Sequence, residues 1–301
     1  MCKPPETDSL RIGTCSWKYP AWKGLIYPDR TTLNYLKSYA EHFNTVEVDQ
    51  WFWSLYGPGK IKMPEPGVVQ EYVNSVPPGF KFTIKVPNSV TLTHFYKRTH
   101  PELTANPNFL SVDLFRTFLK ILDPMKPYLG PLMFQFEYLN KQKMDSQDRF
   151  LNLLDGFFRQ IPDGYAYTIE LRNPNYLNSQ YFDFLNKHDV FHVFLQGYYM
   201  PSIFDLFNTY VDRIQNQTVI RLLGADRKGI EERSGGHWNR IVDPKDDELN
   251  SILTMLKHLQ ARQISVYLNV NNHYEGCAPL TINKIKQGLT SYSDTRIQNE
   301  E

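Results

Sequence analysis

The stretch YAYTIELR, residues 165–172, shows the alternation that decides the fold class. Its apolar side chains alternate with a polar set, Thr168, Glu170 and Arg172. Successive side chains of a β-strand point to opposite faces, so one face of this strand is apolar and the other is polar. The pattern predicts a strand that packs against helices on one side and carries charged groups on the other.

Seven further stretches have the length and composition of strands: RIGTCSW (11–17), TVEVDQWFW (45–53), KFTIKVP (81–87), PLMFQF (131–136), FHVFLQG (191–197), TVIRLLG (218–224) and ISVYLNVNN (264–272). Helical spacing of apolar residues between them is clearest at 33–43, 112–122 and 251–260. Eight strands that alternate with helices predict an α/β protein with a parallel sheet, and eight is the number that closes a single (β/α)8 TIM barrel. The main alternative, an open doubly wound sheet, usually has a glycine-rich phosphate turn after its first strand, and this sequence has none.

Composition indicates a folded chain without a strong overall charge. Of 301 residues, 41% are hydrophobic and 14% aromatic, and the formal net charge is +1, which selects neither nucleic acid nor a membrane as partner. Cys2, Cys15 and Cys277 have no CxxC spacing, which argues against a disulfide framework or a zinc site. No signal peptide and no run of about 18 apolar residues is present. We therefore expect a cytoplasmic protein that has no membrane partner, and the oligomeric state stays open.

No linker or change in composition divides the sequence. We expect one barrel domain over residues 11–290, a flexible N-terminal tail at 1–10 and a polar C-terminal tail at 291–301. The two longest loops follow the third and seventh strands, at the end of the barrel where TIM-barrel enzymes build their active sites.

The polar face of the strands predicts the site. If the apolar face packs on helices, the inward-facing residues include Glu47, Asp49, Lys85, Gln135, Glu170, Arg172, His192, Gln196, Arg221, Asn269 and Asn271. The same alternation predicts that Cys15 points toward the helices. Burying unpaired charges is costly, so these groups either form a self-neutralising network that fills the barrel or line a site at the carboxyl ends of the strands.

Several motifs resemble one known family. GTCSWKYPAWKGLIYP (13–28), YAEHFNTVEV (39–48), PPGFKFTIKVPNSVTLTH (77–94), ELRNPNYL (170–177), RLLGADRKGI (221–230) and NNHYEG (271–276) are similar to motifs of the YecE-like family, the domain of unknown function 72. The resemblance runs from residue 13 to about residue 289. It implies a TIM barrel and the location of the site, but no reaction, because none is established for the family.

This sequence departs from the family pattern near the expected site. Asp49 stands where the family tends to have Asn, and Gln196 stands where it commonly has an acid. Asn173 replaces the usual His, and Leu223 stands where a His is frequent. The resemblance therefore allows a retained fold with altered chemistry.

The favoured functional hypothesis is a small-molecule enzyme with a phosphorylated or carboxylated substrate, although the sequence leaves open whether the protein is an enzyme. Lys85, Arg172 and Arg221 come from three strands and could bind an anion together. The guanidinium group of Arg can donate two parallel hydrogen bonds to a phosphate or a carboxylate. Basic residues in the two long loops, Lys97, Arg98, Arg227, Lys228, Arg233 and Arg240 with His94, His100 and His237, either add to this charge or form ordinary solvated surface. Glu47 or Glu170 is the candidate for proton transfer, and Lys85 is a candidate nucleophile. The remaining candidates for substrate binding are Asn269, Asn271, His273, Asp49, Gln135 and Gln196.

Other functions stay open. A non-catalytic protein that binds nucleic acid or an anionic metabolite needs the same cations. A metal-assisted phosphodiesterase would need a divalent metal, but no HxH or HExxH spacing is present, and no cofactor is predicted. Glycoside hydrolysis needs a carboxylic acid with a raised pKa, which neighbouring Lys and Arg oppose. Trp17, Tyr19, Trp22, Trp51, Phe52 and Trp53 could stack a base or sugar, and packing of the loops over the barrel rim explains them equally well.

Overall fold

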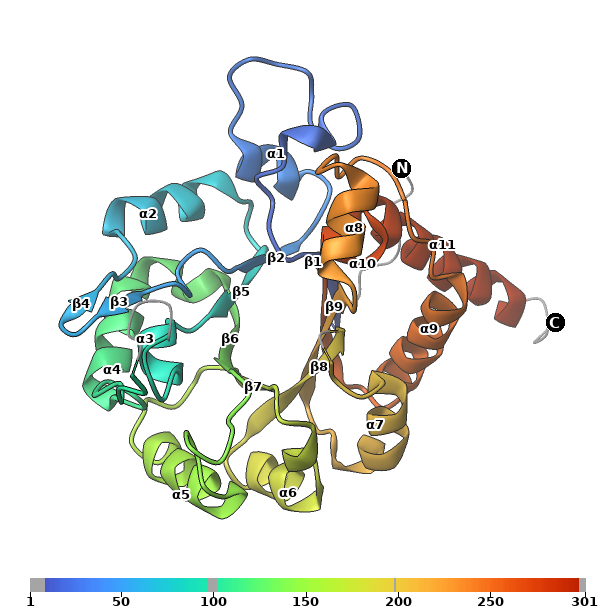
Figure 1. Cartoon of the computed structure of the whole chain (residues 1–301). Coiled ribbons are helices and arrows are strands. Elements are labelled where there is room, and N and C mark those ends of the chain that lie inside the picture. Colours follow the sequence, from blue (N-terminus) through green and yellow to red (C-terminus); the bar gives the residue numbers. More distant parts are fainter. Residues whose placement is uncertain (1–8, 97–101, 198, 298–301) are drawn as a thin grey trace. The chain divides into compact units, whose positions relative to one another are not determined.

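The computed structural model describes residues 9–96, 102–197 and 199–297. Its main sheet is a closed barrel of eight parallel strands in the order β1-β10-β9-β8-β7-β6-β5-β2 (Figure 1). The strands are β1 (Leu10–Thr14), β2 (Thr45–Val48), β5 (Lys81–Lys85), β6 (Leu129–Phe136), β7 (Tyr167–Leu171), β8 (Val190–Gly197), β9 (Gln217–Gly224) and β10 (Ser265–Val270). Each strand overlaps one of the eight predicted stretches, so the (β/α)8 prediction is confirmed.

Helices follow the strands along the chain. They are α1 (Tyr35–Ala40), α2 (Pro66–Ser75), α3 (Asn88–Thr91), α4 (Val112–Ile121), α5 (Gln147–Phe158), α6 (Ser179–Lys187), α7 (Ile203–Tyr210), α8 (Arg227–Ser234), α9 (Asp246–Ala261), α10 (Asn272–Glu275) and α11 (Ala278–Ile297). Short 3-10 helices lie at Pro20–Trp22, Asp123–Tyr128, Pro174–Tyr176 and Val211–Arg213. The segment before α2 forms a small antiparallel hairpin, β3 (Leu55–Gly57) and β4 (Lys60–Ile61). Helix α11 continues into the segment that the sequence predicts as a C-terminal tail.

Side-chain caps fix where two of the helices begin. The Asn34 side chain accepts a hydrogen bond from the Lys37 amide at the start of α1, and Ser146 accepts one from the Arg149 amide at the start of α5. Asn and Ser are among the residues favoured at this position, because their side-chain oxygens accept from the free amides of the first turn. In the described part of the chain, no helix has the length and apolar character needed to cross a membrane.

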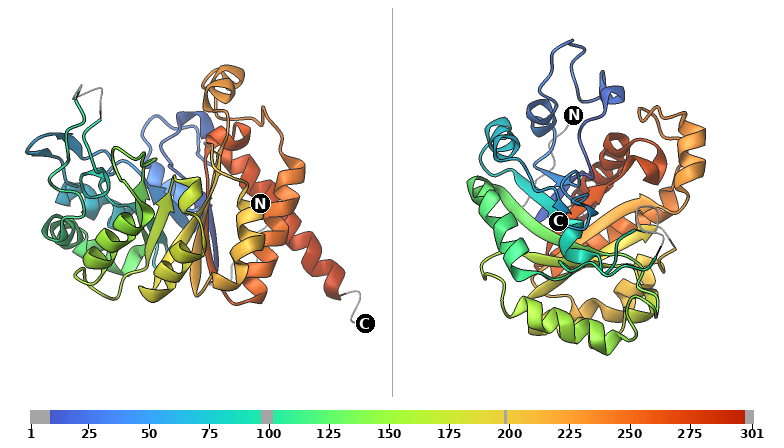
Figure 2. Two further views of the ribbon diagram at one scale, coloured as in Figure 1. Left: turned by 60° about the horizontal axis from the view of Figure 1, so that its bottom comes forward. Right: turned by 60° about the vertical axis from the view of Figure 1, so that its left-hand side comes forward.

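The contacts divide the chain into two compact units. Unit 1 comprises Met1–Val46 and Phe194–Glu301, and unit 2 comprises Glu47–Val193. In unit 1, α9 and α11 lie side by side (Figure 2). The core of unit 2 is an aromatic cluster in which Phe115 of α4 meets Phe134 of β6 and Tyr167 of β7 at ring-centroid distances of 5.2 and 5.8 Å. The apolar face of these strands therefore packs on helices, as the alternation predicts.

Strand β8 faces the opposite way from the prediction. His192 lies against α6, with its Nδ1 3.2 Å from the Tyr181 hydroxyl, and Gln196 donates to Glu248 of α9 at 2.7 Å. Both residues therefore point toward helices, and the prediction that they face inward is wrong. The alternation in β8 is ambiguous because Phe194 shares their face and packs on Phe207 of α7 at 6.0 Å.

Cys15 also faces the other way. It is buried in contact with Leu195 of β8 and Leu223 of β9. Strands β1 and β8 are not neighbours in the sheet, so these side chains can meet only on its inner side. The predicted outward direction of Cys15 is wrong, and the Leu223 that departs from the family pattern completes this apolar cluster.

Gly13 lets β1 and β2 approach closely. A Cβ atom at this position would lie 2.1 Å from the carbonyl oxygen of Thr45. We expect Gly13→Ala to lower the free energy of unfolding by about 3 kcal/mol, because backbone must move to relieve the clash. Gly156→Ala in α5 is the matched control, since its Cβ would have no neighbour within 4 Å and alanine favours helix by roughly 0.5–1 kcal/mol. Urea unfolding of both variants checks this, and equal stability of the two would contradict it.

Candidate functional site

Two ion pairs lie on the inner face of unit 2, near the carboxyl ends of its strands. The first joins β2 and β5: the Lys85 Nζ lies 3.5 Å from the Glu47 Oε1. The Glu47 side chain is fully buried, whereas 11% of the Lys85 side chain is exposed. The Lys85 ammonium also lies 5.4 Å from the centre of the Phe52 ring. Lys85 stands in register with Met133, and the next residue of β6, Phe134, packs on α4, so Lys85 and its partner Glu47 face inward as expected.

The second pair lies at the end of β7. The Arg172 Nε donates to the Glu170 Oε1 at 2.9 Å. Here too the carboxylate side chain is fully buried and the cation is partly exposed, at 29%. Gln135 of β6 stands opposite Glu170 in the strand register. Gln135 is 8% exposed, and its Oε1 has no hydrogen-bond partner among the residues that the structure describes.

Asp49 lies just beyond the end of β2 and is half-buried. The pKa of the Tyr72 phenol in α2 is raised, mainly by burial and further by the negative charges of Glu71 and Asp49.

Unit 1 places Arg221 and Asn269 beside each other. They are in register on β9 and β10, and Gly13 stands in register with Asn269 on β1. Arg221 is 2% exposed and Asn269 is fully buried. Neither the nitrogen nor the oxygen of the Asn269 amide has a hydrogen-bond partner in the described segments. A buried amide of this kind is costly, so Asn269 stays a candidate for binding a polar group.

Asn271 and His273 are hydrogen-bonded to each other, and His273 is also bonded to α8. The Asn271 Oδ1 accepts from the His273 amide at 2.9 Å and faces its Nδ1 at 2.6 Å, while the His273 Nε2 lies 3.0 Å from the Glu231 Oε1. The Trp238 ring packs on the His273 imidazole, with 4.9 Å between the ring centroids. Burial lowers the pKa of His273, and the hydrogen bond with Glu231 opposes this shift. These contacts give both residues a clear role in anchoring α8.

The basic residues after β9 are mostly paired with acids. In α8, Arg227 pairs with Glu231 at 2.9 Å, and Lys228 pairs with Glu232 at 3.7 Å. Arg233 contacts Asp226 at 3.5 Å and Asp243 at 3.3 Å. The basic residues of this helix therefore fit an ordinary solvated surface better than an anion-binding site. Lys97, Arg98 and His100 lie outside the described residues, as does Cys2.

Three structural residues were not recognised as such from sequence. The Asn88 Oδ1 accepts from the backbone amides of Ser54 and Leu55, both at 2.9 Å, and so fixes the segment after β2. Asn173 makes two hydrogen bonds with the backbone of Leu139, at 2.8 and 2.9 Å, which explains the Asn at this departure from the family pattern. Glu275 is fully buried and accepts several hydrogen bonds within unit 1.

Most of the aromatic residues near the strand ends are packed. Trp17, Trp22, Trp51 and Phe52 are all at most 8% exposed, which confirms the packing interpretation for them. Trp53 differs, because 57% of it is exposed. Across residues 9–96, 102–197 and 199–297, no group of three or more His, Cys, Asp or Glu residues is arranged to hold a metal ion.

Comparison with known proteins identifies the family. A DUF72 family protein from Enterococcus faecalis has a TM-score of 0.66 at 20% identity, over 93% of this chain and 95% of that chain. A DUF72 family protein from Thermotoga maritima has a TM-score of 0.64 at 19% identity, over 93% of this chain and 99% of that chain. None of the curated proteins matches the sequence. The family model described as "Protein of unknown function DUF72" matches residues 11–300. The resemblance drawn from the motifs is thus confirmed, and this chain belongs to the DUF72 family.

Proposed function

We propose that this DUF72 protein is an enzyme that binds a small anionic substrate at the carboxyl ends of the strands of unit 2. One observation supports the proposal above the others. In both inner-face ion pairs the carboxylate is fully buried and only the cation reaches solvent. A ligand that approaches this face meets Lys85 and Arg172, so an anion is favoured over a cation.

The buried glutamates have positioning roles in this proposal. Glu47 lies behind Lys85 and holds its ammonium near the Phe52 ring, and Glu170 holds Arg172 through Nε. Because neither carboxylate is exposed, direct proton transfer from Glu47 or Glu170 to a substrate would require a rearrangement. Lys85 is better placed to touch the substrate and to exchange a proton with it, while Glu47 positions its ammonium.

The unpaired amide oxygen of Gln135 supports a bound ligand at the same place. Its Oε1 is buried beside Glu170 and lacks a hydrogen-bond partner in the described part of the chain. A substrate hydroxyl or amine would supply the missing donor. The proposed substrate is therefore a small carboxylate or phosphate that also carries a hydrogen-bond donor.

Thermal unfolding across a panel of sugar phosphates and hydroxy-carboxylates tests the binding. A ligand at about 100 times its Kd adds roughly 2.7 kcal/mol, which raises the Tm by a few degrees. We expect Arg172→Gln to abolish this rise. Arg149→Gln is the matched control, because its side chain is 62% exposed in an i,i+4 pair on α5 of the same unit. If no compound raises the Tm of the wild type while Arg172→Gln lowers the Tm of the bare protein, the inner charges are scaffold and the proposal fails.

Turnover separates an enzyme from a binding protein. Incubating the wild type with the compound that raises its Tm, followed by mass spectrometry and proton–deuterium exchange in deuterated water, measures conversion. We expect Lys85→Gln to lower the rate at least about a hundredfold, the usual contribution of a general acid or base. A compound that binds through Arg172 but returns unchanged, without deuterium, would instead identify a non-catalytic binding protein.

A further inference from the structure

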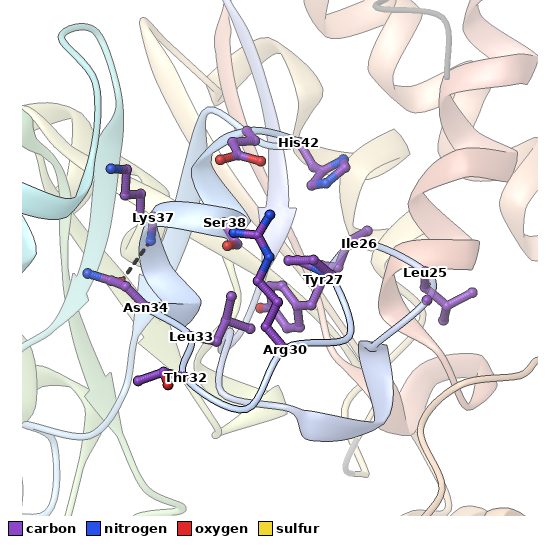
Figure 3. A pocket seen from close by; sticks show the side chains of 13 residues that line it. Leu25, Ile26, Tyr27, Arg30, Thr32, Leu33, Asn34, Lys37, Ser38 and His42 are labelled. Atoms are coloured by element: carbon purple, nitrogen blue, oxygen red, sulfur yellow. Dashed lines mark hydrogen bonds between the residues drawn. The ribbon is translucent and has the colours of Figure 1, made fainter.

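A cavity lies in unit 1, beside α1 and the loop that precedes it (Figure 3). Its volume is about 620 Å³, and its walls come from the loop before α1, from α1 itself and from the two residues after it. A space of this size matches the pockets that proteins use for small metabolites. None of the candidate residues predicted from the strands lines it.

The walls of this cavity carry excess positive charge. Arg30 and Lys37 line it together with the imidazole of His42, whereas Glu41 is the one carboxylate among its lining residues. In the described part of the chain, the side chains of Arg30 and Lys37 have neither an ion pair nor a hydrogen bond. The neighbouring acid Asp29 is engaged with Lys23 instead, at 3.3 Å. The cavity therefore presents cations without a neutralising partner from the protein.

Hydroxyl groups and an apolar floor complete the cavity. Thr32 and Ser38 contribute hydroxyls, and Figure 3 shows the Arg30 guanidinium reaching across toward Ser38. Ile26 and Tyr27 form a floor that is 5% and 2% exposed. The Tyr27 hydroxyl donates to the Trp17 carbonyl oxygen, so its oxygen is already engaged by the protein.

The loop that builds the floor is anchored from both sides. The Trp22 indole nitrogen donates to the Trp238 carbonyl oxygen at 2.9 Å, and the Tyr27 ring packs edge-on against Tyr35 at 5.1 Å. The floor is therefore formed before any ligand binds, which reduces the entropy cost of binding.

We propose that this cavity binds a small phosphate monoester whose organic part rests on Ile26 and Tyr27. Two permanent cations and an imidazole set against one carboxylate suit a dianion better than a singly charged carboxylate. The Thr32 and Ser38 hydroxyls supply donors for the remaining phosphate oxygens. This site goes beyond the proposed function, since it involves other residues and another part of the chain.

Isothermal titration with phenyl phosphate and benzoate tests the proposal, because the two probes share a ring and differ in the anion. We expect phenyl phosphate to saturate the wild type at one site, and benzoate to bind at least about tenfold more weakly. Arg30→Gln should weaken phenyl phosphate about tenfold or more, which is the usual effect of losing one charge-assisted hydrogen bond. Lys228→Gln is the charge-matched control, since Lys228 is 89% exposed on α8.

Each outcome of the titration supports or overturns phosphate binding in this cavity. Equal affinity for benzoate overturns the phosphate assignment, and equal weakening by Lys228→Gln shows non-specific attraction only. If Arg172→Gln abolishes phenyl phosphate binding and Arg30→Gln does not, the anion occupies the unit 2 site, so this inference fails while the proposed function is supported. Lys37→Gln removes the other cation of the cavity, from an exposed position on α1, and should also weaken phenyl phosphate. If one of the two variants fails to fold, the other still tests the proposal.

Discussion

Glu275→Ala is expected to lower the free energy of unfolding by about 3–5 kcal/mol, the usual effect of breaking a buried charged network. The Glu275 side chain is fully buried. Its Oε1 accepts from the Lys245 amide at 2.8 Å and from the Lys284 Nζ at 2.9 Å, and its Oε2 accepts from the Thr281 hydroxyl at 2.7 Å. Alanine would leave the Lys245 amide without this acceptor, whereas the Lys284 ammonium keeps its ion pair with Asp246 and the Thr281 hydroxyl keeps the Cys277 carbonyl oxygen. The unpaired amide and the space left by the side chain account for much of the expected loss.

Urea unfolding of two further variants makes this measurement specific. Glu232→Ala removes an α8 glutamate side chain that is 67% exposed and should change stability by no more than about 0.5 kcal/mol. Glu275→Gln keeps the shape and one acceptor oxygen, so its loss should fall between those of the two alanine variants. A loss below about 1 kcal/mol for Glu275→Ala would show that the Lys245 amide finds another partner.

The role of Glu275 shows what the motif NNHYEG could not reveal. The sequence indicates only that its hydrogen-bonding residues follow a strand, where TIM barrels place their sites. The partner that fixes Glu275 is the amide of Lys245, 30 residues earlier in the chain. No local pattern encodes such a contact. His273 of the same motif likewise binds Glu231, which lies on a helix whose position is set by tertiary packing, and Asn271 binds the other ring nitrogen of His273.

The alternation of side chains predicted the direction of β7 correctly and that of β8 wrongly. In β7, Ile169 and Leu171 mark the helix-facing side, so Glu170 and Arg172 were correctly expected to face inward. In β8 the wholly apolar face of Phe191, Val193 and Leu195 is not the helix-facing one, because His192, Phe194 and Gln196 on the other face contact helices. The helix partners Tyr181 and Glu248 decide the direction there, and period-2 alternation cannot show them. Sequence alone also could not show that the cations, rather than the carboxylates, are the exposed members of the two inner ion pairs.

The reversed face of β8 leads to the second large expected effect, a loss of stability in acid that depends on His192. Its imidazole is buried between the Tyr181 hydroxyl and the Phe182 ring, whose centroid lies 5.2 Å away. Burial lowers the pKa of His192 to about 3, although the charge of Glu170 raises it. A histidine in the unfolded chain has a pKa near 6.5. The unfolded state therefore binds a proton at a pH where the folded state does not.

The sign of the effect follows from this difference. The contribution of His192 to stability is fully present above about pH 6.5, and it is lost as the pH falls toward about 3. Each pH unit in this window costs about 1.4 kcal/mol, so the loss reaches about 2 kcal/mol at pH 5. Urea unfolding between pH 7.5 and 4.5 measures the slope. The slope for His192→Gln should lack the contribution of His192, whatever the stability of this variant at neutral pH. The control His237→Gln, which changes an exposed residue, should keep the wild-type slope. Equal slopes for the wild type and His192→Gln would mean that the folded protein accommodates the charged imidazole, and the strand β8 environment would then be more polar than its helix contacts indicate.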